Sequence, residues 1–250
     1  MLMTAQTVWR VFLNTEEREA HHDWVKSGFD GPGRIVVENE NLSEAKIPGS
    51  DLTKISLKRC NLSKSQFMGV YFRCAELVEC NFDGSGLYIS KFDEAHIKKC
   101  QFTDTDLKVS DFIRTKVQEG DWSESDLHRS DWTEAHVTDA NFQKTRFQGA
   151  KFNRARFTNC DFRGANLIAT MAYDSVFEKC DFRYADIDDF VFKNTLFYKC
   201  GFYGCKNLPT LEGDCKIIDA DISENFDGSK IIDSDTLFQN WGIEKQMVSS

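Results

Sequence analysis

Residues 100–122 read CQFTDTDLKVSDFIRTKVQEGDW, and a large apolar residue recurs there at every fifth position: Phe102, Leu107, Phe112, Val117 and Trp122. The same spacing runs without an insertion from Leu42 to Phe202, and all 33 of its positions are apolar although the chain is 41% hydrophobic. Neither the 3.6-residue period of an α-helix nor the two-residue period of a strand gives a period of five. The pattern therefore predicts a repeat structure that turns a corner every five residues.

A second column of residues stands two positions before each large one. Thirty of its 33 members are Ala, Ser, Cys, Thr, Val or Gly, and the exceptions are Glu40, Ile55 and Phe190. Each pentad thus offers one small and one large inward-facing side chain. Four such sides would close a square coil of 20 residues, and coils could stack through strand-like backbone hydrogen bonds.

The cysteines test the coil length independently, because six of them are spaced by 20 residues: Cys60, Cys80, Cys100, Cys160, Cys180 and Cys200. Gly120 and Ala140 fill the gap between the two sets. At strand spacing the column would rise about 4.8 Å per coil. A buried cysteine packs as a small hydrophobe, which favours a structural role. A disulfide ladder or a metal column is the less favoured alternative.

Several pentads match a known motif, among them Ala165-Asn166-Leu167, Ala140-Asn141-Phe142 and Ser110-Asp111-Phe112. With these residues the chain resembles the pentapeptide-repeat proteins, whose motif is written A(D/N)LXX, over residues 40–202. The resemblance implies an all-β solenoid, a right-handed quadrilateral β-helix of about eight coils. Stacked at strand spacing, these coils would be roughly 38 Å high.

Both ends of such a rod expose strand edges and an apolar cross-section, so short helical caps are expected. We predict three segments: an N-terminal helical cap and turn (residues 1–38), the β-helix (residues 39–223) and a C-terminal cap or helix (residues 224–250). The first helix would lie between Thr15 and Gly28, before a turn at residues 31–33. Beyond Phe202 the register slips around Leu208, which predicts one irregular final coil.

A short helix from about Ser234 to Gln246 would close the C-terminal end with Leu237, Phe238 and Trp241. In the topoisomerase-protecting members of the family, a C-terminal segment makes the dimer contact. The resemblance therefore implies a possible homodimer here, although capping alone also explains these apolar residues.

The sequence offers little catalytic chemistry, and we expect no enzyme, no cofactor and no metal site. His96 and His136 fall in one column but two coils apart, about 10 Å, which is too far to share a metal. His21 and His22 are expected on the polar side of the first helix, in solvent. Many Asp and Asn residues directly precede a large core residue, where a turn-stabilising role is favoured over catalysis; they are Asn61, Asn81, Asp111, Asp121, Asp131, Asp161 and Asp181.

The charge is −9 overall, and two adjacent segments carry it with opposite sign. The acidic band lies in residues 119–139 and is the candidate partner-binding surface: Glu119, Asp121, Glu124, Asp126, Asp131, Glu134 and Asp139. The basic band follows in residues 144–163: Lys144, Arg146, Lys151, Arg154, Arg156 and Arg163. The alternative is a solvated surface whose charges compensate one another.

One side of the rod carries outward apolar residues, which can mark a partner site or lie beneath a terminal segment: Met68, Tyr88, Ile89, Val109, Ile168 and Ala169.

Two functions follow as hypotheses. The first is a protein-interaction scaffold with an unidentified partner, because the fold supplies a stiff surface and specifies no ligand. The alternative, implied by the resemblance, is a DNA mimic that binds a type II topoisomerase (DNA gyrase or topoisomerase IV) and confers antibiotic resistance. The basic band argues against the second hypothesis, since a basic DNA-binding saddle would repel it. We expect no direct nucleic-acid binding, no membrane attachment and, with no export signal, a cytoplasmic location.

Overall fold

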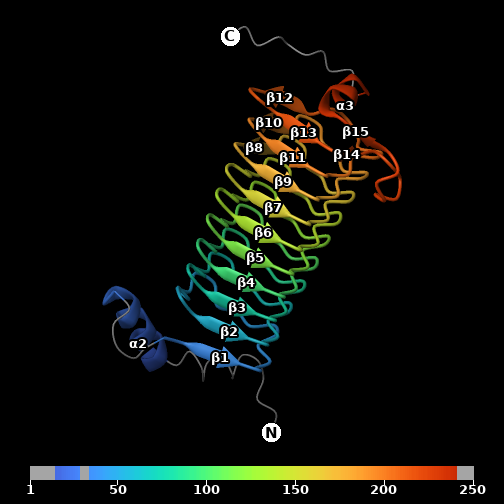
Figure 1. Cartoon of the computed structure of the whole chain (residues 1–250). Coiled ribbons are helices and arrows are strands. Elements are labelled where there is room, and N and C mark those ends of the chain that lie inside the picture. The colour runs from blue at the N-terminus through green and yellow to red at the C-terminus, as the bar shows by residue number, and fades with distance from the viewer. Residues whose placement is uncertain (1–14, 29–33, 241–250) are drawn as a thin grey trace.

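The computed structural model describes residues 15–28 and 34–240, and within them the chain forms a rod of stacked coils (Figure 1). One side of the rod is a parallel sheet to which each coil contributes one three-residue strand. Its strands, in order along the rod, are β1 (Val36–Glu38), β2 (Ser56–Lys58), β3 (Glu76–Val78), β4 (His96–Lys98), β5 (Lys116–Gln118), β6 (His136–Thr138), β7 (Arg156–Thr158), β9 (Val176–Glu178), β11 (Leu196–Tyr198) and β13 (Lys216–Ile218).

The other three sides are also parallel ladders, made mostly of single bridges such as Asn61 with Asn81 and Gln66 with Gly86. On one of them the bridges lengthen into β8 (Met171–Tyr173), β10 (Val191–Lys193) and β12 (Thr210–Glu212). The predicted quadrilateral β-helix is confirmed. It has about nine turns where the pentads predicted about eight coils, because the irregular chain beyond Phe202 completes another turn.

Backbone hydrogen bonds hold each coil to its neighbours. The amide of Phe82 donates to the carbonyl of Gln101 at 2.7 Å, and the amide of Asn81 donates to the carbonyl of Cys60 at 3.0 Å. The chain turns a corner at the second residue after each large core residue. The residue at the corner has a positive φ, as Glu94 (58°) and Arg114 (55°) do. A non-glycine residue in this region costs about 1–2 kcal/mol. The ladder hydrogen bonds made at the corners themselves offset this cost.

The large column forms the core, with aromatic rings stacked from coil to coil. Phe82 and Phe102 are parallel with ring centroids 4.8 Å apart, and Phe102 stacks on Trp122 at 4.0 Å. Of the 33 predicted inward positions every one is buried except Ile47, which is half-buried in the first coil. The period of five therefore identified the core correctly, and the exception lies where no earlier coil covers it.

In the column of small inward residues, most Ser and Thr hydroxyls donate a hydrogen bond to the carbonyl oxygen 23 residues earlier. Ser85 Oγ donates to Leu62 O at 2.8 Å and Thr145 Oγ1 to Trp122 O at 2.9 Å. Cysteine makes the same contact more weakly: Cys80 Sγ lies 3.3 Å from Leu57 O. The six cysteines of the column are buried in the core, which confirms the packing role predicted for them, and all nine cysteines are free thiols.

The gap in the cysteine column has a steric cause. A Cβ atom at Gly120 would lie 2.6 Å from Nε1 of Trp122, closer than non-bonded atoms approach. The indole of Trp122 therefore occupies the space that a cysteine side chain takes in other coils. Ala140, in the next coil, is buried without difficulty.

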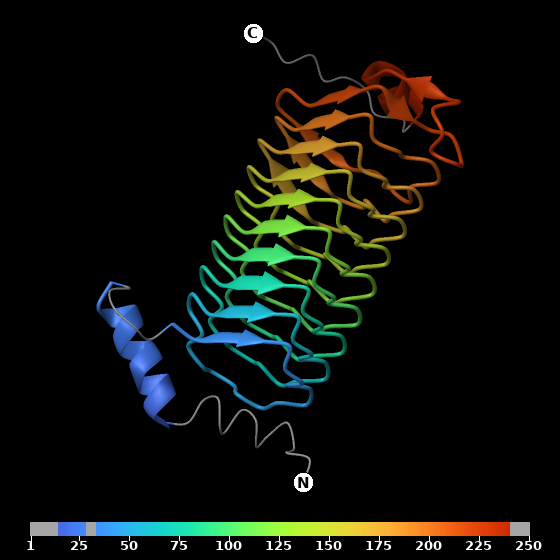
Figure 2. The same cartoon turned by 60° about the horizontal axis from the view of Figure 1, so that its bottom comes forward.

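At the N-terminal end, α2 (Thr15–Lys26) lies beside the first coils (Figures 1 and 2). The amide of Ile35 donates to Nδ1 of His21 at 3.3 Å, and Trp24 is buried. The expectation that His21 is solvated was wrong: it is 1% exposed, because it faces the chain that enters β1. The side chain of His22 and the turn expected at residues 31–33 lie outside the described residues.

At the C-terminal end, the final coil stays paired with the coil before it through a local shift of register by one residue. Phe192 pairs with Leu211, 19 residues later, whereas Phe197 pairs with Ile217, 20 residues later. Leu208, where the slip was expected, is exposed, and the neighbouring Pro209 is buried.

A short antiparallel pair, β14 (Ala220–Asp221) and β15 (Ile231–Ile232), then leads into α3 (Ser234–Asn240), which packs against β13 (Figure 2). Leu237 and Phe238 are buried, as the predicted closing helix required. Trp241 and the rest of the predicted helix lie outside the described residues. Neither helix in the described part of the chain has the length and apolar character needed to cross a bilayer.

Candidate binding surface

Outward side chains stack in straight columns, because every coil repeats after 20 residues. The column just before the large residues holds turns: Asp121 Oδ1 accepts from the amide of Ser123 at 2.9 Å, two residues further on. The same contact occurs at six of the seven predicted positions: Asn61, Asn81, Asp121, Asp131, Asp161 and Asp181. The seventh, Asp111, forms an ion pair with Lys91. The turn-stabilising role is therefore confirmed at these six positions.

Every residue of the acidic band has a partner one coil away. The pairs are Glu119 with Lys99 (3.5 Å), Asp121 with Asn141 (3.0 Å), Glu124 with Lys144 (3.2 Å), Asp126 with Arg146 (3.2 Å), Asp131 with Lys151 (3.5 Å), Glu134 with Arg154 (2.8 Å) and Asp139 with Asn159 (2.5 Å). Four of these seven partners belong to the basic band.

Four residues of each band thus form two layers of one ladder of ion pairs. The surface compensates its own charge along the rod, as the alternative interpretation of the sequence held. Exposed pairs of this kind contribute about 0–1 kcal/mol each, so they can also exchange partners at low cost. Recognition of a partner through the acidic band stays a prediction.

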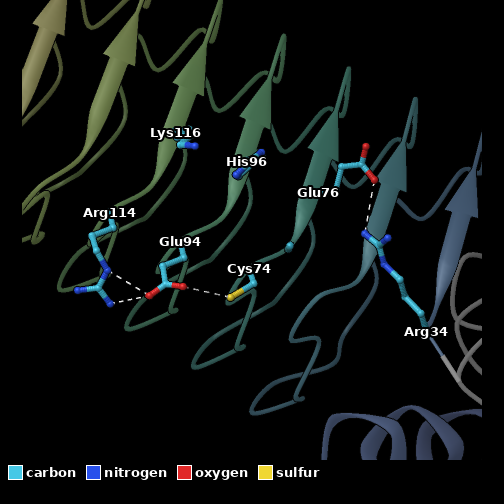
Figure 3. Close-up of a pocket in the computed structure, with 8 residues that line it drawn as sticks. Arg34, Cys74, Glu76, Glu94, His96, Arg114 and Lys116 are labelled. Atoms are coloured by element: carbon cyan, nitrogen blue, oxygen red, sulfur yellow. Dashed lines mark hydrogen bonds and ion pairs between the residues drawn. The ribbon is translucent and has the colours of Figure 1, made fainter. Parts of the chain in front are cut away.

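The sheet side of the rod carries a shallow depression of about 540 Å³, which the sequence did not single out (Figure 3). Its lining comes from β3, β4 and β5 and from the corner that precedes each strand. The residues drawn and labelled in Figure 3 are Arg34, Cys74, Glu76, Glu94, His96, Arg114 and Lys116. A second groove continues from it along the same strands as far as His136 and Thr138.

At one edge of the depression three corner residues form a chain of contacts. Arg114 donates to Oε1 of Glu94 from Nε at 3.1 Å and from Nη2 at 2.6 Å. Cys74 Sγ donates to the other oxygen of Glu94 at 3.6 Å. The hydrogen bonds from Arg114 lower the pKa of the Glu94 carboxyl, and burial together with the charge of Glu94 raises the pKa of the Cys74 thiol. A thiol held protonated is a poor nucleophile, so this arrangement is structural in character.

In the middle of the sheet side, His96, Lys116 and His136 occupy the same position in successive strands. Lys116 lies between the histidines, which are two coils apart as the sequence predicted. Among residues 15–28 and 34–240, no group of three or more His, Cys, Asp or Glu residues could hold a metal ion.

On another side of the rod the predicted apolar residues are largely exposed. Met68 is 52% exposed and Tyr88 39%, and Ile89 and Val109 are each 38% exposed. Ala169 is also exposed, whereas Ile168 is half-buried. Met68, Tyr88, Ile89 and Val109 come from three successive coils, and we call these four residues the apolar side.

Two family models match the chain. One, described as a pentapeptide repeat region, matches residues 75–152, and the other, described as pentapeptide repeats (8 copies), matches residues 41–73, 50–87 and 160–197. Together these matches span more than half of the 250 residues. No curated protein matches the sequence.

Among solved structures, the chain is similar to HetL, a pentapeptide repeat protein involved in heterocyst differentiation regulation from the cyanobacterium Nostoc sp. strain PCC 7120. The identity is 15%, the match covers 81% of this chain and 96% of HetL, and the TM-score is 0.45. It is also similar to a trypsin-treated form of QnrB1, a plasmid-mediated fluoroquinolone resistance protein: 15% identity, 72% and 90% coverage, TM-score 0.46. A pentapeptide repeat protein from the Arabidopsis thaliana thylakoid lumen is 25% identical, over 35% of this chain and 61% of its own, with a TM-score of 0.34.

Proposed function

This chain belongs to the pentapeptide-repeat family and folds as its right-handed β-helix, and we propose that it is a non-enzymatic scaffold that binds a protein partner. The fold holds outward side chains in fixed columns on a continuous core, which is the arrangement a recognition surface needs. Nine free thiols fit a reducing compartment, so we place this function in the cytoplasm.

The observation that carries the proposal is the exposed apolar side. The interior of these coils is already filled, since Phe67, Leu87 and Leu107 are fully buried beneath it. Met68, Tyr88, Ile89 and Val109 therefore add nothing to the core of the fold. Contiguous large apolar side chains on the surface of a folded protein commonly mark an interaction site.

The DNA-mimic hypothesis receives less support from the geometry. A mimic must present uncompensated negative charge, whereas Glu124, Asp126 and Glu134 each face a cation in the next coil. A topoisomerase partner and a homodimer through the C-terminal segment both remain untested predictions.

The proposal is tested by affinity capture with the purified protein, followed by identification of the captured protein and a measured affinity with that protein alone. The variant Tyr88→Lys/Val109→Lys places charge on the apolar side and should weaken binding at least tenfold. Tyr203→Lys, at an exposed tyrosine near the other end of the rod, is the matched control and should bind as the unmodified protein does. Equal binding by both variants would contradict the assignment to the apolar side.

A gyrase supercoiling assay, with and without a quinolone, distinguishes the alternative. Rescue or inhibition at micromolar protein would establish a topoisomerase partner. The triple variant Glu119→Lys/Asp121→Lys/Glu124→Lys should then abolish the effect, because it inverts the acidic band. No effect on supercoiling leaves the scaffold proposal in place.

A further inference from the structure

Four cationic or imidazole side chains form a straight row on the sheet side of the rod. His96, Lys116, His136 and Arg156 are register partners in β4, β5, β6 and β7, and all four are exposed. Lys98 lies beside the row on β4 and is also exposed. We call these five residues the cation row. Figure 3 shows two of them, His96 and Lys116, standing on neighbouring strands.

The cations of this row differ from most others in the middle of the rod, because their charge is not compensated within the fold. On one flank, Glu94 pairs with Arg114 at 2.6 Å and Glu134 with Arg154 at 2.8 Å. On the other flank, Glu119 pairs with Lys99 at 3.5 Å.

These flanking carboxylates are therefore already satisfied by cations of their own corner columns. Across the described part of the chain, Lys98, Lys116 and Arg156 form no ion pair. Glu76, at the lower end of the row, is held by Ser56, Lys58 and Arg34. The row thus keeps three full positive charges and two imidazoles that can donate hydrogen bonds.

The row is hollowed from His96 to His136, where a ligand can lie along it, and Arg156 stands outside this groove. The side chains of His96, Lys98, Lys116 and His136 line one groove, whose other walls include Glu76, Val78 and Thr138. Three coil steps separate His96 from Arg156, which is roughly 14 Å at strand spacing. An extended polypeptide covers that length with about four to five residues and presents alternate side chains to one face.

We propose that the cation row binds an extended acidic segment of a partner protein, with carboxylates of that segment on Lys116 and Arg156, which are two coils or about 10 Å apart at strand spacing. The proposal rests on the scaffold function and assigns that scaffold a second surface with a defined chemistry. Charge complementarity supports it: the row is positive within a molecule of net charge −9, so it is the place where an acidic chain meets attraction.

A peptide fits this surface better than a nucleic acid does. Single-stranded nucleic acids bind through aromatic side chains on which bases stack. The outward positions of β3 to β7 hold no Phe, Tyr or Trp: they are Glu76, Val78, His96, Lys98, Lys116, Gln118, His136, Thr138, Arg156 and Thr158.

The test measures fluorescence anisotropy of a labelled octaglutamate peptide with the full chain at low salt and pH 7. We expect saturable binding that weakens as salt is raised. The variant Lys116→Ala/Arg156→Ala should lower the affinity at least tenfold, whereas Lys116→Arg/Arg156→Lys should retain it. Lys46→Ala, which removes an exposed lysine on another side of the rod, is the control and should change it less than twofold.

Circular dichroism verifies that each variant is folded, which is expected because the substituted side chains are exposed. Absence of saturable octaglutamate binding, or equal binding by the double alanine variant, overturns the proposal. Tighter binding of an eight-nucleotide oligothymidylate than of the peptide overturns it in favour of a nucleic acid. A captured protein partner that binds the double alanine variant unchanged would show that the scaffold function holds and that the cation row is not its site.

Discussion

The regular coils, built from the pentads up to Phe202, and the final coil beyond Phe202 both stack on the coil before them, but their sequences differ. In the regular coils the apolar column and the backbone ladder keep one 20-residue register, so that Phe157 lies under Phe177 with rings 5.2 Å apart. In the final coil the pentads fail, yet the chain drops one residue before Thr210 and regains it before Lys216. The backbone ladder is therefore the stricter requirement, and the side-chain pattern can slip when a coil has no further coil to support.

We expect the largest effect on stability from a charge placed in the core of the regular coils. Phe112 is fully buried between Phe92 (4.9 Å) and Trp132 (4.2 Å). The substitution Phe112→Asp would bury an unpaired carboxylate, at a cost of more than about 4 kcal/mol. We expect no folded protein, as measured by far-UV circular dichroism.

The matched change in the final coil is Ile217→Asp, at a residue that is equally buried. Because β13 ends the sheet, the carboxylate can reach solvent when only β13 and α3 detach. The regular coils should stay folded, and limited proteolysis should cut only beyond β11. Global unfolding by Ile217→Asp would show that the last coil is not independent of the rod. Phe112→Leu is the conservative control and should remain folded.

The second prediction concerns the gap in the cysteine column. Gly120→Cys would complete the column by sequence but place Cβ against the indole of Trp122. Overpacking of this kind costs typically 1–3 kcal/mol, which urea unfolding would measure. The double variant Gly120→Cys/Trp122→Phe removes the opposing Nε1 atom and should recover most of the loss. Without such recovery, the steric account of the gap would be wrong.

Phe112 and Gly120 show which features of the fold could be predicted from the sequence and which could not. The period of five identified the core residues and the four-sided coil, because an inward position in a repeat leaves its apolar signature on every turn. It predicted the cysteine column, but not why Gly120 interrupts it, since the reason lies in the orientation of one indole ring.

The surface was less predictable for a related reason. Along the sequence, an acidic band is followed by a basic band. Because residues 20 apart lie side by side in neighbouring coils, the two bands form ion pairs such as Glu134 with Arg154. The sequence placed His96 and His136 in one column and Arg156 in the basic band, but it did not show the cation row as one surface, because the members of the row are 20 residues apart and lie among acidic neighbours. Stacking outward residues by coil would have revealed both features, whereas the depression itself depends on side-chain positions.

The third prediction uses the thiols of the regular coils. The pKa of Cys80 is raised to about 12, chiefly by its hydrogen-bonding contact with Cys100 and by burial, from an ordinary value of 9.0. A group whose folded pKa is raised contributes stability that is fully present below its unfolded pKa and is lost as pH rises toward the folded one. The free energy of unfolding should therefore fall from about pH 9 upward.

The measurement compares urea unfolding at pH 7 and pH 10 for the unmodified protein and for Cys80→Ala. The alanine variant should lose about 1 kcal/mol less on going to pH 10, because it lacks one titrating thiol. Cys215→Ala is the matched change in the final coil, where the thiol is half-buried and its pKa is less strongly raised. It should alter the pH dependence less, and an equal alteration would contradict the contrast between the two regions.

The smallest expected effect compares surface ion pairs in the two regions. In the regular coils Arg154 donates from Nε and Nη2 to one oxygen of Glu134, at 3.0 and 2.8 Å, and the pair continues a ladder. In the final coil Asp214 and Lys216 pair at 3.2 Å with both side chains mostly exposed. A double-mutant cycle of Glu134→Gln with Arg154→Met should give a coupling of about 0.2–1 kcal/mol at low salt. The cycle of Asp214→Asn with Lys216→Met should give a coupling near zero, because solvent screens that pair and no neighbouring coil orders it. If the two couplings were equal, the stacking of coils would not order the surface charges, and the self-compensating ladder would be a feature of geometry without energetic consequence.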